Sequence, residues 1–146
     1  MHGKAVLDTT YLLPFFGVRV RGLEADTVLK LRNELGAELL YPELLLPELA
    51  ARIAKEMAKR KLRRLPQQAS EALMALLLEV DISLVRPRKE HIETAIKLKA
   101  LGHPDIFDCI LYATALYEDA VLVTRDRELI KFLESHGLET DVIIVK

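Results

Sequence analysis

Tryptophan is absent from this sequence of 146 residues, and cysteine occurs once, as Cys109. A single cysteine excludes an internal disulfide and a cysteine-rich zinc site, and we expect Cys109 to be an inert core thiol. Aromatic residues make up 5% and hydrophobic residues 51% of the chain, so the core must consist mainly of Leu, Ile, Val and Ala. The length suffices for one domain with a real core, which we expect to span residues 1–146.

Long hydrophobic runs and an excess of one charge are lacking too. No apolar run approaches the length of a membrane span, and the N-terminal MHGK leaves no room for a signal peptide before the first apolar run. We therefore expect a cytoplasmic protein that does not contact a membrane. The net charge of −1 neither indicates nor excludes nucleic-acid binding, because a local basic stripe can be hidden in a neutral total. The scarcity of Asn and Gln favours a thermophilic source.

Short apolar runs alternate with longer segments that have helical spacing. The apolar runs predict five strands, at residues 5–7, 39–41, 82–85, 120–123 and 142–145. The segments between them predict a short helix or turn at residues 11–16 and helices at residues 23–35, 43–64, 67–79, 88–99, 105–117 and 127–135. In the 43–64 segment, Pro47 can mark the true first turn. This alternation predicts an α/β fold with a parallel sheet and helices on both faces.

Acidic residues fall at the carboxyl edge of this predicted sheet, where ligands bind in open α/β folds. Asp8 ends the first strand and Asp126 follows the fourth, while Glu48 and Asp108 lie in the first turns of helices that begin at the same edge. Each acid alone is equally well explained as a helix cap or a dipole partner. Capping does not explain why all four acids converge from separate segments of the chain. Glu43 competes with Glu48 for its place, and Asp105 either competes with Asp108 or joins the site as a fifth acid.

Converging carboxylates repel one another, and they either raise their pKa values or recruit a cation. Hard oxygen ligands without nearby Cys or His select Mg²⁺ or Mn²⁺. Such an ion can polarise a phosphate and lower the pKa of a water molecule, which is the chemistry of phosphodiester hydrolysis.

Three stretches together resemble a known family. VLDTTYLL near the N-terminus, PELLLPEL after the second predicted strand, and DIFDCILYATAL followed by VLVTRDREL are similar to the PIN domain nucleases, and more narrowly to the small VapC-type toxins. The resemblance implies a three-layer α/β/α fold with a five-stranded parallel sheet of order 3-2-1-4-5. It also implies a divalent-metal-dependent endoribonuclease, the toxin of a toxin–antitoxin pair, with RNA as substrate, a cognate antitoxin as partner and a homodimer as assembly.

The resemblance also implies roles for individual residues. The catalytic acids, which also hold Mg²⁺ or Mn²⁺, would be Asp8, Glu48, Asp108 and Asp126. Thr9, Thr124 and Asp105 would support them. Two other functions stay open: a housekeeping PIN nuclease in RNA processing, and a PIN-fold module that binds RNA or protein without cleaving. A phosphoacceptor receiver domain fits less well, because it needs a strand-end lysine late in the chain, where only the terminal Lys146 stands.

A basic run over residues 52–64, which begins with Arg52, follows the acidic segment PELLLPEL. It is either an RNA-binding arm or the solvated face of a helix, and we assign weak RNA-binding roles to Lys59, Arg60, Lys61, Arg63, Arg64 and Arg125. For Arg125 a structural ion pair is an equal alternative. The four histidines are scattered singly, so we expect surface or packing roles for them: His2, His91, His103 and His136. The Leu-rich stretch 71–78 either packs on a neighbouring helix or forms a dimer face.

Overall fold

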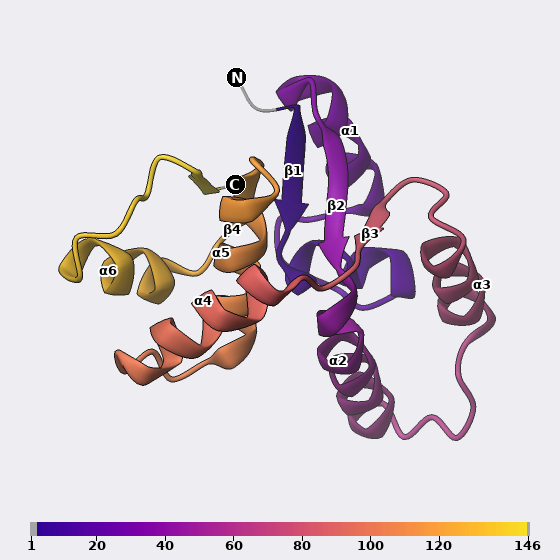
Figure 1. The fold of residues 1–146 in the computed structure, drawn as a ribbon. Helices are drawn as coiled ribbons and strands as arrows, with labels where there is room; N and C mark the ends of the chain where they lie inside the picture. Colours follow the sequence, from indigo (N-terminus) through magenta and orange to yellow (C-terminus); the bar gives the residue numbers. More distant parts are fainter. Residues whose placement is uncertain (1–2, 146) are drawn as a thin grey trace.

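The computed structural model describes residues 3–145 of the chain. Its strands are β1 (Lys4–Leu7), β2 (Glu38–Pro42), β3 (Ser83–Val85), β4 (Val121–Thr124) and β5 (Ile143–Val145). They form one sheet in the order β3-β2-β1-β4-β5, in which every neighbouring pair is parallel (Figure 1). The predicted five-stranded parallel sheet and its strand order are therefore confirmed, and helices flank the sheet in an α/β/α arrangement.

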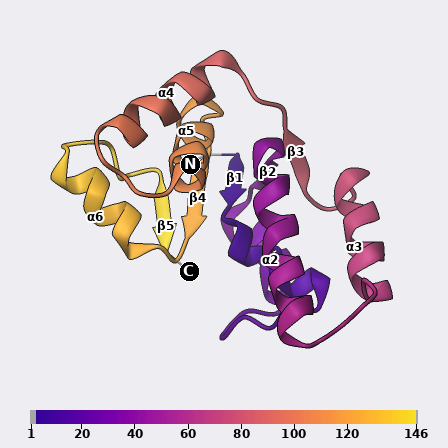
Figure 2. The same ribbon diagram turned by 90° about the horizontal axis from the view of Figure 1, so that it is seen from below.

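The helical segments also lie where the sequence predicts them. They are η1 (Thr9–Tyr11), η2 (Leu13–Phe16), α1 (Ala25–Leu35), η3 (Glu43–Leu45), α2 (Leu46–Lys59), α3 (Gln67–Leu77), α4 (Lys89–Ala100), α5 (Ile106–Tyr117) and α6 (Arg127–Ser135). In both ribbon views α2 and α3 lie to one side of β1 and α4, α5 and α6 lie to the other (Figures 1 and 2). No helix in the described part of the chain is long and apolar enough to span a bilayer.

The largest departure from prediction concerns the helix expected over residues 43–64. The segment begins instead as the short η3, and α2 starts at Leu46 with Pro47 in its first turn, where a proline is tolerated. The helix ends at Lys59 because Lys61 adopts a left-handed conformation (φ 56°) and the amide of Leu62 donates to the carbonyl of Met57 at 2.9 Å. This is a Schellman ending with lysine in the glycine position. Residues 60–64 consequently form a loop, not a helix face.

Helix α5 is buried on most of its surface, as its apolar sequence predicts, and it packs on β1, β2 and β4. Cys109 is fully buried on this helix, and burial raises the pKa of its thiol to about 11, which keeps it protonated. In the sheet, Leu7 is in register with Val123. Because parallel neighbours end at the same edge, the residues that follow β1 and those that close β4 come together there, and the β1 and β2 arrows point toward α2 (Figure 1).

Candidate active site

Asp8 follows β1 directly and lies between two elements that are distant in sequence. Its Oδ1 accepts a hydrogen bond from the backbone amide of Thr10 at 3.3 Å, so Asp8 caps η1. Its Oδ2 accepts a hydrogen bond from the Thr124 hydroxyl, at the end of β4, at 2.9 Å. Burial raises the pKa of Asp8, and the hydrogen bond from Thr124 only partly opposes this effect. Asp8 is therefore both a cap and a buried carboxylate at the β1–β4 junction.

Glu48 enters the same edge from the first turn of α2. The buried Thr9 hydroxyl donates a hydrogen bond to Oε1 of Glu48 and lies 2.7 Å from the hydroxyl of Tyr41, at the end of β2. Burial raises the pKa of Glu48, and the negative charges of Asp8 and Asp105 add to the rise. The competing acid Glu43 is exposed in η3. The fold thus brings Glu48 toward Asp8 and leaves Glu43 at the surface.

Asp108 and Asp126 form the opposite side of the cluster. Asp108 lies in the first turn of α5 and is only 8% exposed. Burial raises its pKa to about 9, and a hydrogen bond to Asp126 and the charges of Asp105, Asp126 and Asp8 act in the same direction. For Asp126, burial raises the pKa, but the hydrogen bond from Asp108 and those from two backbone amides outweigh it and lower the pKa. Asp108 therefore holds the proton of this pair and Asp126 the charge.

The remaining acid of the region, Asp105, is the N-cap of α5. Its Oδ1 accepts a hydrogen bond from the amide of Phe107 at 2.9 Å. Its negative charge raises the pKa values of both Glu48 and Asp108. Asp105 thus lies at the margin of the cluster, as a cap that adds charge to it. Asp126 caps α6 in the same way, through hydrogen bonds from the amides of Glu128 and Leu129.

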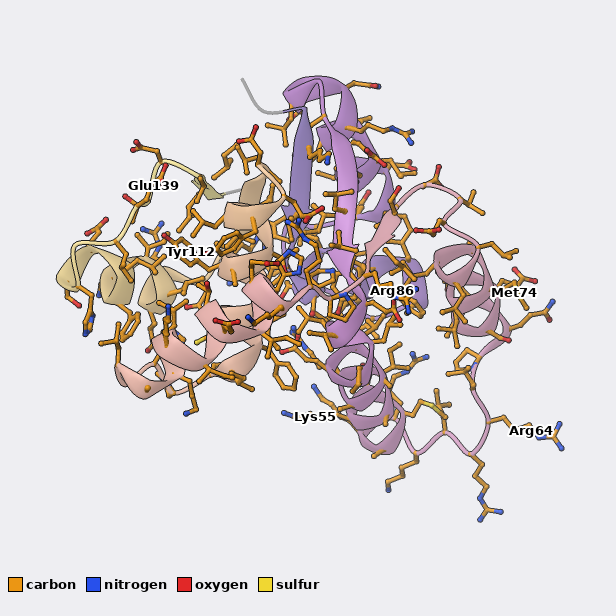
Figure 3. All side chains as sticks on the ribbon, viewed as in Figure 1. Lys55, Arg64, Met74, Arg86, Tyr112 and Glu139 are labelled. Carbon is orange, nitrogen blue, oxygen red and sulfur yellow. The ribbon has the colours of Figure 1, made fainter. Side chains whose placement is uncertain are left out.

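Positive charge reaches this cluster from Arg52 of α2, which is not among the residues assigned an RNA-binding role. Arg52 donates to the Thr10 hydroxyl at 3.1 Å, and its charge lowers the pKa values of Asp8 and Glu48. Lys55, one turn along α2, points toward the side of the molecule that carries α4 and α5, whereas Arg64 points away from the body of the protein at the far end of the loop (Figure 3). The predicted basic run therefore covers two different locations.

Arg125 has a structural environment. One of its terminal nitrogens donates to the backbone carbonyl of Arg21 at 2.6 Å, and its guanidinium lies 5.9 Å from the centre of the Tyr11 ring. These contacts connect the β4–α6 junction to the segment before α1. They are a hydrogen bond and a cation–π contact.

Three residues near the acids were not assigned to the site from the sequence. Tyr41 contacts Thr9, and Arg52 contacts Thr10, which follows Asp8. His103 is 2% exposed, and its Nε2 lies 3.8 Å from Oδ2 of Asp108. Nothing in the local sequence around Tyr41 distinguishes it, whereas Arg52 begins the basic run over residues 52–64. For His103 a signal existed: it stands before Pro104, in the turn that leads into the acidic start of α5.

The donor set of this cluster fits Mg²⁺ or Mn²⁺, since it consists of carboxylate and hydroxyl oxygens. Among residues 3–145, no three Asp, Glu, His or Cys side chains are grouped closely enough to hold one metal ion as they stand. The carboxylates instead accept hydrogen bonds from Thr9, Thr124 and helix-capping amides. A bound cation would therefore require these carboxylates to move closer together, and each can keep its present donor, because a carboxylate has lone pairs for both.

Comparison with known proteins shows the fold and the family of the chain. A search of curated proteins found no match. Among solved structures, a toxin–antitoxin complex from Klebsiella pneumoniae superposes with a TM-score of 0.62 at 16% identity, covering 97% of this chain and 96% of that one. PAE2754 from Pyrobaculum aerophilum superposes with a TM-score of 0.58 at 19% identity, covering 97% and 88%. These likenesses show the shared fold. Because the PIN domain family matches residues 5–133, the chain belongs to the PIN domain family.

Proposed function

We propose that this protein is a divalent-metal-dependent endoribonuclease that hydrolyses RNA phosphodiester bonds, and that it is the toxin of a toxin–antitoxin pair. The observation that supports this most strongly is the electrostatic coupling of Asp8, Glu48, Asp108 and Asp126, which come from four segments to one sheet edge. Membership of the PIN domain family supports nuclease activity. The toxin role draws on the toxin–antitoxin complex among the structural neighbours.

The roles of the acids follow from their surroundings. Asp8 and Asp126 would hold Mg²⁺ or Mn²⁺ directly, while Glu48 and Asp108 would hold it or orient the attacking water. The ion, when bound, would polarise the phosphate and lower the pKa of a water molecule. Thr124 and Thr9 donate to Asp8 and Glu48, so they would limit the rotation of these carboxylates. Asp105 would support the site through its charge.

Substrate binding needs positive charge next to this acidic cluster. Arg52 is the cation whose contacts lie within it, and it would approach a phosphate bound beside Asp8. The cations at the end of α2 and in the following loop would bind RNA phosphates farther along the chain, because each neutralised phosphate releases condensed counterions. These residues are Lys59, Arg60, Lys61, Arg63 and Arg64, and we propose a weaker role of the same kind for Arg125.

The test of this function is cleavage of a mixed RNA pool in Mg²⁺, in Mn²⁺ and in chelator. We expect cleavage only with a divalent ion, and a loss of several orders of magnitude in Asp8→Asn and Asp126→Asn, since each would remove a ligand charge. Asp141→Asn, an exposed aspartate outside the cluster, is the matched control and should cleave normally. Full activity in Asp8→Asn would contradict the proposal. RNA binding without cleavage or metal binding would favour a non-cleaving module.

We also propose protein partners, namely an antitoxin and a second copy of the chain. An apolar cavity of about 310 Å³ between α2 and α3, lined by residues such as Leu49, Ile53 and Leu73, supports a protein ligand. Met74 of α3 and Leu78, which follows α3, are 60% and 67% exposed, and Met74 points outward in Figure 3. Light scattering should show a dimer that Met74→Glu/Leu78→Glu converts to a monomer. Cleavage should be suppressed by the product of a neighbouring gene.

A further inference from the structure

His103 is a buried histidine whose second ring nitrogen has no hydrogen-bond partner. The side chain is 97% buried, and its Nε2 has no hydrogen-bond partner among the described residues. A buried polar group without a partner costs free energy. Oδ2 of Asp108 lies 3.8 Å from this atom, just beyond hydrogen-bonding distance.

The other ring nitrogen lies against the backbone of Asp105. The backbone amide of Asp105 donates to Nδ1 of His103 at 3.1 Å. The carbonyl of Asp105 lies 3.2 Å from the same nitrogen. The amide contact needs Nδ1 as an acceptor, whereas the carbonyl contact would need it as a donor. The carbonyl of Asp105 already accepts a hydrogen bond from the amide of Cys109 at 3.3 Å, so a proton on Nε2 leaves both backbone groups with a partner. In that tautomer Nε2 is a donor that faces the carboxyl group of Asp108.

The ring is also held in this orientation by packing. Phe132 of α6 contacts the His103 ring edge to face, with ring centres 4.8 Å apart. The amide of Asp105 and the ring of Phe132 thus hold the imidazole in place. If the Asp108 carboxylate moved toward it by about 0.8 Å, the Nε2–Oδ2 distance would reach a normal hydrogen-bond length of about 3.0 Å.

We propose that His103 is a positioning residue for Asp108: its Nε2–H donates a hydrogen bond to the Asp108 carboxylate when that group holds a divalent ion. The inference rests on the proposed function, which makes Asp108 a metal ligand. Groups that hold a metal are themselves oriented by hydrogen-bonded neighbours, and removing such a neighbour lowers metal affinity or activity by about 10–100-fold. In most such pairs a carboxylate orients a ligating histidine, whereas here the histidine would orient the carboxylate.

Three variants test this role through metal affinity, measured by calorimetry with Mn²⁺. His103→Phe removes the donor, and we expect Mn²⁺ binding to weaken about 10–100-fold. His103→Gln keeps an amide donor, and we expect affinity within about threefold of the wild-type value. His136→Phe is the matched control, because His136 packs against the same Phe132 ring at 4.3 Å but is exposed. Its affinity should not change.

Nitrogen-15 spectra of the ring supply an independent readout. We expect the Nε2–H tautomer in the metal-free protein and a shift of the Nε2 resonance on adding Mg²⁺. An Nδ1–H tautomer, wild-type affinity in His103→Phe, or equal weakening in His103→Phe and His103→Gln would each overturn the inference while the wild-type protein still binds metal. Absence of Mn²⁺ binding by the wild-type protein would overturn the proposed function as well, so the two failures are distinguishable.

Discussion

The hydroxyl of Thr124 donates a hydrogen bond to Oδ2 of Asp8 at 2.9 Å, between residues 116 positions apart in the chain. The same hydroxyl oxygen accepts a hydrogen bond from the backbone amide of Asp126 at 3.0 Å. One hydroxyl thereby connects the acid that follows β1 to the acid that caps α6. Its hydrogen bond to Asp8 opposes the rise that burial causes in the pKa of Asp8, and so it favours the charged form of Asp8.

Replacing Thr124 by valine keeps the side-chain shape and removes the hydroxyl. Because the variant cannot donate this hydrogen bond to a carboxylate, we expect the metal-free protein to be less stable by about 1.5–3 kcal/mol. Mn²⁺ affinity should fall by about 10-fold or more. Thr114→Val is the matched control, since the buried Thr114 hydroxyl donates to the Ile110 carbonyl within α5. Equal Mn²⁺ affinity in the two variants, measured by calorimetry, would contradict the role given to Thr124.

The buried charge of Asp8 should reduce stability when no metal is bound. Burial raises the pKa of Asp8, so we expect the melting temperature of Asp8→Asn in chelator to equal or exceed that of the wild type. Mn²⁺ at about a hundredfold excess over Kd should stabilise the wild type by about 2.7 kcal/mol and should leave Asp8→Asn unchanged. Strong destabilisation of metal-free Asp8→Asn would show that Asp8 serves as a structural cap.

Asp126 gives the opposite expectation for the same substitution. Its pKa is lowered, because hydrogen bonds from Asp108 and from the first amides of α6 outweigh burial. Its charge therefore stabilises the fold, and metal-free Asp126→Asn should be less stable by about 0.3–1 kcal/mol. Thermal unfolding in chelator, run beside Asp8→Asn, checks the difference in sign. If both variants shift in the same direction, the contrast between the two carboxylates is wrong.

The strands were predictable because each is a short apolar run between segments with helical spacing. Each strand lies within a residue or two of its predicted position. Helix ends were less predictable. α2, α3 and α5 are followed by Lys61, Glu79 and Asp119 in the left-handed conformation. Where glycine takes this position, as Gly36 does after α1, the ending is visible in the sequence. Because no glycine follows α2, the sequence pattern extends the predicted helix to residue 64, although α2 ends at Lys59.

The acids of the candidate site were predictable because strand ends and helix starts share one edge of a parallel sheet. Their partners were not. Tyr41 reaches Thr9, and Arg52 reaches Thr10 across 42 residues of sequence, through side-chain directions that spacing does not reveal. His103 was expected to have a surface or packing role. It does pack on Phe132, yet it also faces Asp108, a relationship that depends on the geometry of the turn before α5.

The pH dependence of stability should report the proton on Asp108. Its pKa rises from 3.8 in the unfolded chain to about 9 in the fold, so the folded state binds more protons between these values. Stability is then greatest below about pH 4 for this group and decreases as the pH rises toward 9. The raised pKa values of Asp8 and Glu48 act in the same direction. The lowered pKa of Asp126 acts oppositely, since its stabilisation disappears as the pH falls.

Urea unfolding in chelator between pH 5 and about pH 9 measures this slope, which cannot exceed about 1.4 kcal/mol per pH unit for one proton. Asp108→Asn should flatten it, while Asp141→Asn, at an exposed position, should keep it. A wild-type slope that survives in Asp108→Asn would mean that the proton resides elsewhere in the cluster.

The basic loop makes a separate prediction about RNA. We expect replacement of five cations by glutamine to weaken RNA binding and to flatten its salt dependence. The slope of log K against log salt should change by about 0.7 for each RNA phosphate that the variant no longer neutralises. The residues are Lys59, Arg60, Lys61, Arg63 and Arg64. Fluorescence anisotropy with a labelled single-stranded RNA, in chelator to prevent cleavage, measures the slope.

The control for this change removes the same number of exposed cations from other elements. Those residues are Arg19, Lys30, Lys89, Lys97 and Lys131. Both variants lower the net charge equally, so a long-range effect of charge would weaken RNA binding to the same extent in each. Only direct binding of phosphates by the loop makes the salt dependence of the loop variant flatter than that of the control. Equal slopes in the two variants would therefore assign the loop to solvent and leave Arg52 as the cation that meets the RNA.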